Sequence, residues 1–268
     1  MSFRQNVTRS ASRKPRRLRW MILIILIVVV GSLGFDLYGP HSHGLKDFDP
    51  NQVARLETDM WRAYYAKQRV KLFTEMAELM RTQYGMPYAM SNAVAYQAAK
   101  AAFVFKEGKK REDYEKALPN LVNFYQAIHD GADVDFDVQK AAKLELEWWI
   151  IHRQRDKYSL KDLNRSLAEL PAEVYRVPAE RLMEHARLRQ EAMTIRDKKA
   201  EEGGVTEADW QKIHELLQAS WKSLFDAVNA SLFGTEPSHG HLWTWRNSPQ
   251  NAQKSQRKIA TQAIESLS

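Results

Sequence analysis

The first 38 residues join a basic segment directly to an apolar one. Residues 1–20 hold seven basic side chains and no acidic one, at Arg4, Arg9, Arg13, Lys14, Arg16, Arg17 and Arg19. The 16 residues from Trp20 to Phe35 are all uncharged, and most of them are Ile, Leu or Val. As a helix, residues 20–38 rise about 27 Å, close to the ~30 Å hydrocarbon core of a bilayer. This pattern predicts one transmembrane helix that contacts the lipid bilayer.

The flanks of this segment predict its orientation. Basic residues are retained on the cytoplasmic side of a membrane, and here three of them, Arg16, Arg17 and Arg19, directly precede the apolar run. Trp20 and Tyr38 lie at its two ends, where aromatic rings favour the headgroup layers. We therefore expect residues 1–19 to be a basic cytoplasmic tail and residues 20–38 a signal-anchor. Everything that follows is then extracytoplasmic, and periplasmic if the source is bacterial.

A cleaved signal peptide is the alternative to a retained anchor. The apolar region of such a peptide commonly spans about 7–15 residues and is followed by small residues. Ser32-Leu33-Gly34 supplies small residues at a tolerable spacing, although no Ala-x-Ala occurs in residues 20–48. The sequence leaves the two interpretations open.

Charge and cysteine content exclude several classes of function. The chain after residue 20 contains 33 basic and 33 acidic residues, so it carries no net charge. The net charge of +7 therefore comes from the seven basic residues of the tail. Nucleic-acid binders need a basic surface that this neutral region lacks, and we expect no nucleic-acid partner. The chain has no cysteine, which excludes disulfides, a thiol nucleophile and iron–sulfur ligation.

Apolar residues recur at three- and four-residue steps through residues 49–233, as in helices that bury one face. No Gly or Pro occurs between Pro50 and Gly85, and only Lys67 breaks the apolar stripe there, which predicts one helix of about 34 residues. A further helix is expected over residues 138–158, and its centre, residues 144–151, is apolar on most of its circumference, which predicts that it lies in the core. Two further helices begin at the capping boxes Ser159/Asp162 and Thr206/Asp209, the first ending at Pro171.

No segment alternates with the period of two that a strand requires. The expected fold class is therefore all-α: the transmembrane helix followed by an extracytoplasmic bundle of about six or seven helices, including one long helix. Residues 39–48, with Gly and Pro, predict a juxtamembrane linker, residues 49–233 the helical domain, and the polar residues 234–268 a largely disordered tail.

One group of residues in the predicted core helix combines polar and aromatic chemistry. Glu145, Trp149 and His152 share one helix face at positions i, i+4 and i+7. A buried carboxylate has a raised pKa unless it is paired, and a Glu145–His152 pair in an interhelical cavity would suit ligand binding or acid–base work. The other interpretation is a structural pair with Arg153 or with an arginine of residues 50–84.

Metal and catalytic motifs are weak. Two His-x-His units, His41/His43 and His239/His241, would supply imidazole ligands if the two segments met. A di-iron bundle needs a Glu-x-x-His pair on each of two helices, and the chain has one such spacing, Glu236/His239 in the polar tail. A nucleophile–base constellation and a phosphate-binding Gly-rich loop are absent. The sequence implies no cofactor and favours a binding role over an enzymatic one.

Aromatic residues outside the core stripes mark candidate partner contacts. Trp61 and Tyr65 lie on a second apolar stripe of the predicted long helix, and Trp243 and Trp245 stand in the polar tail. We expect a membrane-anchored binding or scaffold protein, an accessory subunit of a membrane or envelope assembly, with a protein partner or a second copy of itself. The alternative is a helical protein that binds a small ligand or a metal and that has catalytic activity if the Glu/His pair forms.

Overall fold

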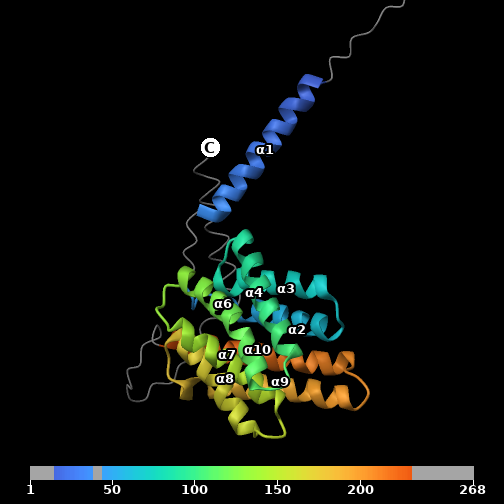
Figure 1. Cartoon of the computed structure of the whole chain (residues 1–268), viewed down its shortest axis with the longest axis vertical. Coiled ribbons are helices and arrows are strands. Elements are labelled where there is room, and N and C mark those ends of the chain that lie inside the picture. The colour runs from blue at the N-terminus through green and yellow to red at the C-terminus, as the bar shows by residue number, and fades with distance from the viewer. Residues whose placement is uncertain (1–14, 39–43, 231–268) are drawn as a thin grey trace, which may run out of the picture. The chain divides into compact units, whose positions relative to one another are not determined.

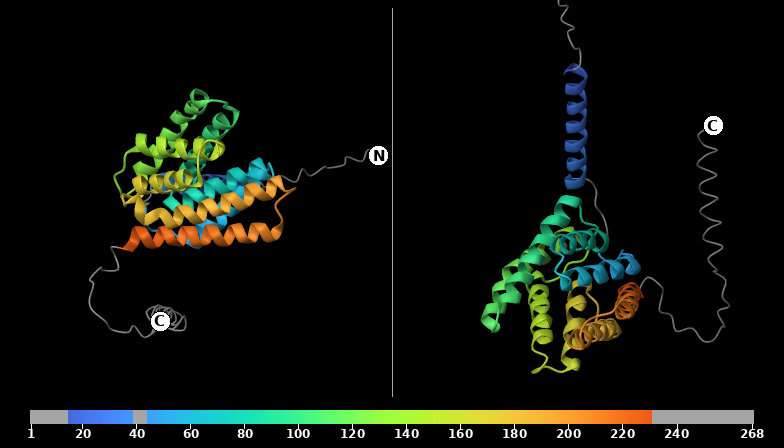
Figure 2. Two further views of the ribbon diagram at one scale, coloured as in Figure 1. Left: turned by 90° about the horizontal axis from the view of Figure 1, so that it is seen from below. Right: turned by 90° about the vertical axis from the view of Figure 1, so that its right-hand side faces the viewer.

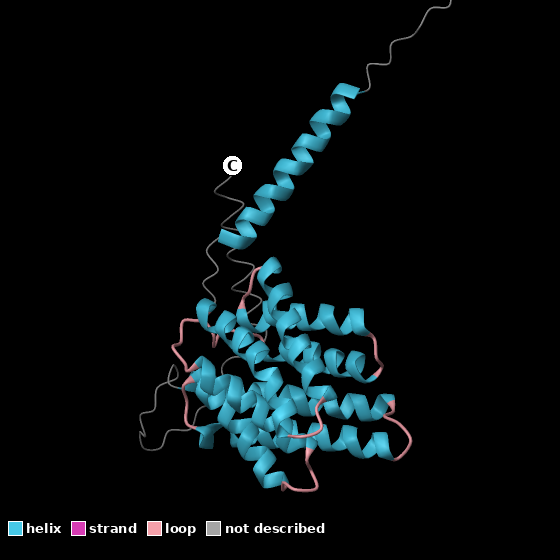
Figure 3. Ribbon diagram, viewed as in Figure 1, coloured by secondary structure: helices cyan, strands magenta, loops and turns pink. Residues whose placement is uncertain are grey.

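The computed structural model describes residues 15–38 and 44–230, except for the side chains of residues 15–18, 33 and 36–38. Every regular element in these described residues is a helix, and none is a strand (Figure 3). The prediction of an all-α fold is confirmed for this part of the chain.

Helix α1 (Pro15–Tyr38) contains the segment predicted to span a membrane. Each side chain from Trp20 to Val30 is 48–61% exposed, so the helix presents apolar groups around its whole circumference. In the described residues, which omit side chains at both ends of α1, no helix is both long enough and apolar enough to cross a membrane. The transmembrane span therefore stays a prediction.

Residues 50–84 form two helices, α2 (Pro50–Tyr65) and α3 (Arg69–Tyr84), so the prediction of one long helix is wrong. The Asp49 carboxylate caps α2 by accepting the Asn51 N–H at 2.9 Å, as its position before Pro50 indicates. The chain reverses at Lys67, the residue that interrupts the apolar stripe, with φ at 58°.

Tertiary packing explains this reversal. A straight helix over residues 50–84 is about 50 Å long and leaves one of its two apolar stripes in water. Folding back places α2 against α3, which buries Val53 and Leu56 of α2 together with Leu79 and Met80 of α3. Removal of these side chains from water favours the hairpin although the turn contains no glycine or proline.

The remaining helices follow with short connections. They are α4 (Tyr88–Glu107), the short α5 (Arg111–Tyr114), α6 (Leu118–Gly131), α7 (Val138–Arg153), α8 (Leu160–Tyr175), α9 (Met183–Glu201) and α10 (Glu207–Asn229). Helices α2 to α10 exceed the expected six or seven because residues 50–84 divide and α5 is added. The core helix α7 also ends at Arg153, five residues before its expected end.

Local side-chain signals set the starts of α2, α7, α8 and α10. Both predicted capping boxes are confirmed, at Ser159/Asp162 for α8 and at Thr206/Asp209 for α10. Helix α8, however, does not end at Pro171 but continues through it to Tyr175. The proline removes one backbone hydrogen bond, yet Val174 and Tyr175 are buried beyond it, so core packing carries the helix past the proline.

The helices of the domain form a closed circuit (Figures 1 and 2). Each long helix packs against the next in the order α2, α3, α4, α6, α7, α8, α9 and α10, and α10 returns to α2. Buried leucine and isoleucine side chains fill the interior, among them Leu56, Leu121, Ile150, Ile213 and Leu224. This arrangement brings polar groups from helices distant in sequence into contact, including those of the candidate site.

Candidate ligand-binding site

Glu145 and Trp149 lie one turn apart on α7 and contact each other, as their spacing predicts. Glu145 Oε1 accepts a hydrogen bond from Trp149 Nε1 at 2.8 Å, and Oε2 accepts one from the Tyr125 hydroxyl of α6, also at 2.8 Å. Burial raises the pKa of Glu145, although these hydrogen bonds favour the ionised form. The carboxylate is thus a partly buried acceptor that connects α6 to α7.

His152 has a different partner, and the predicted pairing of Glu145 with His152 is wrong. The His152 Nε2 atom lies 3.0 Å from Asp197 Oδ2 of α9. Glu145 and His152 are seven residues apart on one helix face, which corresponds to a rise of about 10 Å. This distance is too long for a direct hydrogen bond between the two side chains. Each side chain instead meets a group from a neighbouring helix.

Asp197 is the centre of a charged cluster between α7 and α9. Its carboxylate is bonded by Arg155, in the turn after α7, and by Arg196 at 2.8 Å, in addition to His152. Burial of Asp197 opposes its ionisation, but the hydrogen bonds from His152 and Arg196 outweigh burial and lower its pKa. The cluster ties the C-terminal end of α7 to α9.

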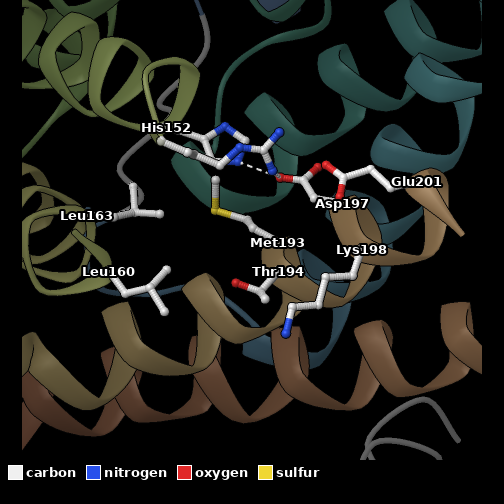
Figure 4. A pocket seen from close by; sticks show the side chains of 9 residues that line it. His152, Leu160, Leu163, Met193, Thr194, Asp197, Lys198 and Glu201 are labelled. Carbon is white, nitrogen blue, oxygen red and sulfur yellow. Dashed lines mark hydrogen bonds and ion pairs between the residues drawn. The ribbon is translucent and has the colours of Figure 1, made fainter. Parts of the chain in front are cut away.

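An open cleft of about 290 Å³ lies beside this cluster. Figure 4 shows Leu160 and Leu163 of α8 on one side and Lys198 and Glu201 of α9 on the other. The lining residues are His152, Arg155, Leu160, Leu163, Met193, Thr194, Asp197, Lys198 and Glu201. Leu163 and Met193 are buried, whereas Leu160 is 56% exposed. Of the three residues proposed from sequence as ligand-binding, His152 is the one that lines this cleft.

A second charged cluster lies deeper, between α2, α9 and α10. Glu57, 2% exposed, forms an ion pair with Arg189 at 2.5 Å and accepts the Trp221 Nε1 hydrogen bond at 2.6 Å. The Arg189 guanidinium also lies 5.8 Å from the ring centre of Trp61 and 6.0 Å from that of Trp148. These contacts supply partners to both charges of the buried ion pair, and they connect α2, α9 and α10.

Trp61 and Tyr65, the predicted partner contacts of α2, both face arginines of α9. Both rings are partly buried, and the Tyr65 ring lies 3.1 Å from the Arg196 guanidinium carbon. Burial raises the pKa of Tyr65 to about 12, because the phenolate is disfavoured in this environment. Their contacts are intramolecular in this structure, and their role toward a partner stays a prediction.

Several predicted site residues lie outside the described residues: His41, His43, His239, His241, Trp243 and Trp245. The side chains of Arg16, Arg17 and Tyr38 are also outside them, whereas those of Arg19 and Trp20 are exposed. In the described part of the chain, no three His, Asp or Glu side chains converge as ligands of a metal ion.

Asp197, Arg155 and Arg189 were missed by sequence reasoning. Asp197 stands between Arg196 and Lys198 in a segment with few apolar residues, a pattern typical of a solvated helix face. The only signal was the low apolar content of residues 178–201, which indicates either water or a polar partner on most faces. Two partners of Asp197, His152 and Arg155, lie more than 40 positions earlier in the sequence, so no local pattern identifies them.

Comparison of the chain with protein-family models, with curated proteins and with solved structures finds no match.

Proposed function

We propose that this protein is anchored in a membrane and works by binding, as a scaffold or accessory subunit of a membrane or envelope assembly. The observation that carries the proposal is the apolar surface of α1. A helix that exposes apolar groups on all sides has no stable arrangement in water, whereas a bilayer accepts it. The exposed side chains from Trp20 to Val30 and the uncharged run to Phe35 support this assignment.

The proposed orientation follows from charge. Seven basic residues precede Trp20, and the first acidic residue of the chain is Asp36. Basic residues are retained on the cytoplasmic side, so the helical domain is assigned to the extracytoplasmic side. The 33 acidic and 33 basic residues after position 20 suit a protein partner rather than a polyanion.

Exposed aromatic side chains on α4 support a binding role. Tyr96 is 58% exposed and Phe103 is 51% exposed, and their seven-residue spacing places them on one face of the helix. Lys100 is the only charged residue between Tyr88 and Phe105. Exposed aromatic side chains on a helix surface with so few charges are typical of protein–protein interfaces.

Native mass spectrometry of the full-length protein, extracted from its own membrane in mild detergent, tests this proposal. We expect a mass above 31.1 kDa that contains a defined partner or a second copy. The double variant Tyr96→Ser/Phe103→Ser should lose the assembly, while Tyr64→Ser, at an exposed tyrosine of α2, should keep it. A monomer of 31.1 kDa from the wild type contradicts the scaffold function.

A second candidate function is the binding of a small ligand. It rests on the cleft of about 290 Å³ beside His152 and Asp197. Ligand sites are concave and combine apolar surface with polar groups that fix orientation; this cleft has three apolar and six polar or charged lining residues, and its volume lies just below the usual range of about 300–1,000 Å³. A ligand that binds only the folded protein raises its melting temperature, which a screen of small metabolites measures.

A further inference from the structure

We propose that the cleft between α8 and α9 binds a small zwitterion with an apolar body, of the class of the free apolar α-amino acids. The proposal rests on the second candidate function and names its ligand class. It follows from three properties of the lining: two charges of opposite sign without partners, hydrogen-bond donors that are still available, and an exposed leucine.

The two charges without partners are Lys198 and Glu201. Both line the cleft, and neither side chain has a hydrogen bond or ion pair within the described part of the chain. The next two charges along α9 differ, because Lys199 and Glu202 pair with each other at 2.8 Å. Lys198 is therefore available to a ligand carboxylate, and Glu201 to a ligand ammonium group.

Further donors lie beside Lys198. Thr194 Oγ1 accepts a hydrogen bond from Gln190 at 2.6 Å, which leaves the hydroxyl proton free to donate. The Arg155 side chain is 51% exposed, and its contact with Asp197 uses one guanidinium nitrogen. Both groups line the cleft, so a bound carboxylate would find donors in addition to the Lys198 ammonium.

The apolar part of the cleft comes from α8 and the middle of α9. Leu160 is 56% exposed, while Leu163 and Met193 lie buried beside it. In Figure 4 the two leucines stand opposite the charged residues, with Met193 between them. An apolar ligand body placed here removes the Leu160 side chain from water, which favours binding.

Size and net charge select among ligand classes. A cleft of about 290 Å³ has room for a free amino acid. The Arg, Lys, Asp and Glu charges of the lining cancel, since Arg155 and Lys198 are balanced by Asp197 and Glu201. A neutral lining with separated charges favours a zwitterion over a simple anion or cation.

A second cleft, between α7 and α8, does not offer this chemistry. It has about 470 Å³ and lies beside Glu173, whose carboxylate is already bonded to Lys140 at 2.6 Å, Arg176 at 2.9 Å and the Asp137 N–H at 3.1 Å. A carboxylate with three donors has little capacity for a ligand.

Methyl NMR of the full-length protein in detergent micelles, with ¹³C-methyl methionine, tests the proposal. The chain has nine methionines, and the variant Met193→Leu identifies the resonance of Met193. We expect L-leucine to shift this resonance and saturate the shift below about 10 mM. Isoamylamine, which lacks the carboxylate, and 4-methylpentanoate, which lacks the ammonium group, should bind at least about tenfold more weakly.

The charge variants supply the controls. Lys198→Gln and Glu201→Gln should each weaken L-leucine binding about tenfold, whereas Lys199→Gln and Glu202→Gln should leave it unchanged. All four side chains are at the surface, so the fold should tolerate each change, and an unaltered melting temperature checks this.

Two outcomes overturn the proposal in different ways. If 4-methylpentanoate binds as tightly as L-leucine, the cleft binds apolar acids; the zwitterion class is then wrong and small-ligand binding stands. If neither L-leucine nor either analogue shifts the Met193 resonance, both the zwitterion proposal and its basis in this cleft fail.

Discussion

At the scale of single residues, the Asp197 side chain connects three segments of the described structure. Asp197 is only 7% exposed, and its carboxylate forms hydrogen bonds with His152, Arg155 and Arg196. These three residues lie at the end of α7, in the following turn and on α9. Because each donor is held by a different segment, loss of the carboxylate would leave several positive or polar groups without an acceptor.

We therefore expect Asp197→Ala to destabilise the protein. Removing one partner of a buried ion pair commonly lowers the free energy of unfolding by about 3–5 kcal/mol. Because Arg155 is half-exposed and its charge is screened by water, we expect a loss of about 2–3 kcal/mol here. Urea unfolding of the full-length protein in detergent, followed by circular dichroism, measures the change. Asp156→Ala, at an exposed aspartate one residue after Arg155, is the matched control and should be nearly neutral. Equal effects of the two variants would show that the cluster contributes no net stability.

Lys67 tests a backbone effect at the same scale. It adopts φ of 58°, where a side chain is disfavoured and glycine is not. Lys67→Gly should stabilise the protein by up to about 1 kcal/mol. Lys143→Gly, at an exposed position inside α7, should have the opposite sign and cost about 1 kcal/mol. Destabilisation by both variants would mean that the Lys67 side chain contributes more than the strain costs.

At the scale of elements, helix starts are set by side chains a few positions apart. The α10 box shows the reciprocal pattern: Thr206 Oγ1 accepts the Asp209 N–H at 3.2 Å, and Asp209 accepts the Thr206 N–H at 2.9 Å. These bonds satisfy donors that the first helical turn otherwise leaves without partners. Because α10 packs on both α9 and α2, its first turn also affects the closure of the circuit.

Removing this cap should cost stability. Thr206→Ala is expected to lower the free energy of unfolding by about 1 kcal/mol, because it exposes an unpaired N–H at the start of α10. Thr74→Ala provides the control, since Thr74 lies inside α3 and its hydroxyl merely bonds Val70 O at 3.0 Å. That variant should be neutral or slightly stabilising because alanine is the better helix former. Equal losses would indicate that the α10 cap frays in solution.

At the scale of the whole molecule, the closure of α10 onto α2 buries titratable groups. His185 of α9 is 4% exposed, and its Nδ1 atom lies 2.8 Å from Ser220 Oγ of α10. Burial, with a further contribution from Arg189, lowers the pKa of His185 to about 3, whereas an unfolded histidine titrates near 6.5.

Stability should therefore fall in mild acid. Between pH 6.5 and 3 the unfolded state binds a proton that folded His185 does not, so its contribution is complete above pH 6.5 and declines as pH falls. The slope is at most about 1.4 kcal/mol per pH unit. The half-buried His129, whose pKa is raised by its hydrogen bond to Asp135, acts in the opposite direction, so the wild type must be compared with a variant.

Urea unfolding between pH 7 and 5 measures this slope. His185→Gln should reduce it while keeping a hydrogen-bond partner for Ser220. Carboxylates with lowered pKa values, such as Asp197 and Glu173, lose their contribution only at lower pH, so they do not obscure the comparison. A variant with the same slope as the wild type would show that His185 does not control acid stability.

Local patterns were enough to predict part of this structure. The apolar periodicity indicated an all-α fold, and Asp49, Ser159 and Thr206 marked helix starts that the structure confirms. The contact of Glu145 with Trp149 also followed from spacing along one helix. These features depend on residues within about one turn of each other, where the geometry of a helix determines which groups meet.

Only the tertiary structure determined which helices reverse, which continue and which side chains pair. The turn at Lys67 and the passage of α8 through Pro171 are both settled by core burial, which outweighs the local preferences of the chain. The pairing of His152 with Asp197 joins residues 45 positions apart, and no local periodicity reports such a contact. The cleft exists because α7, α8 and α9 converge there, and that convergence requires the closed circuit of helices.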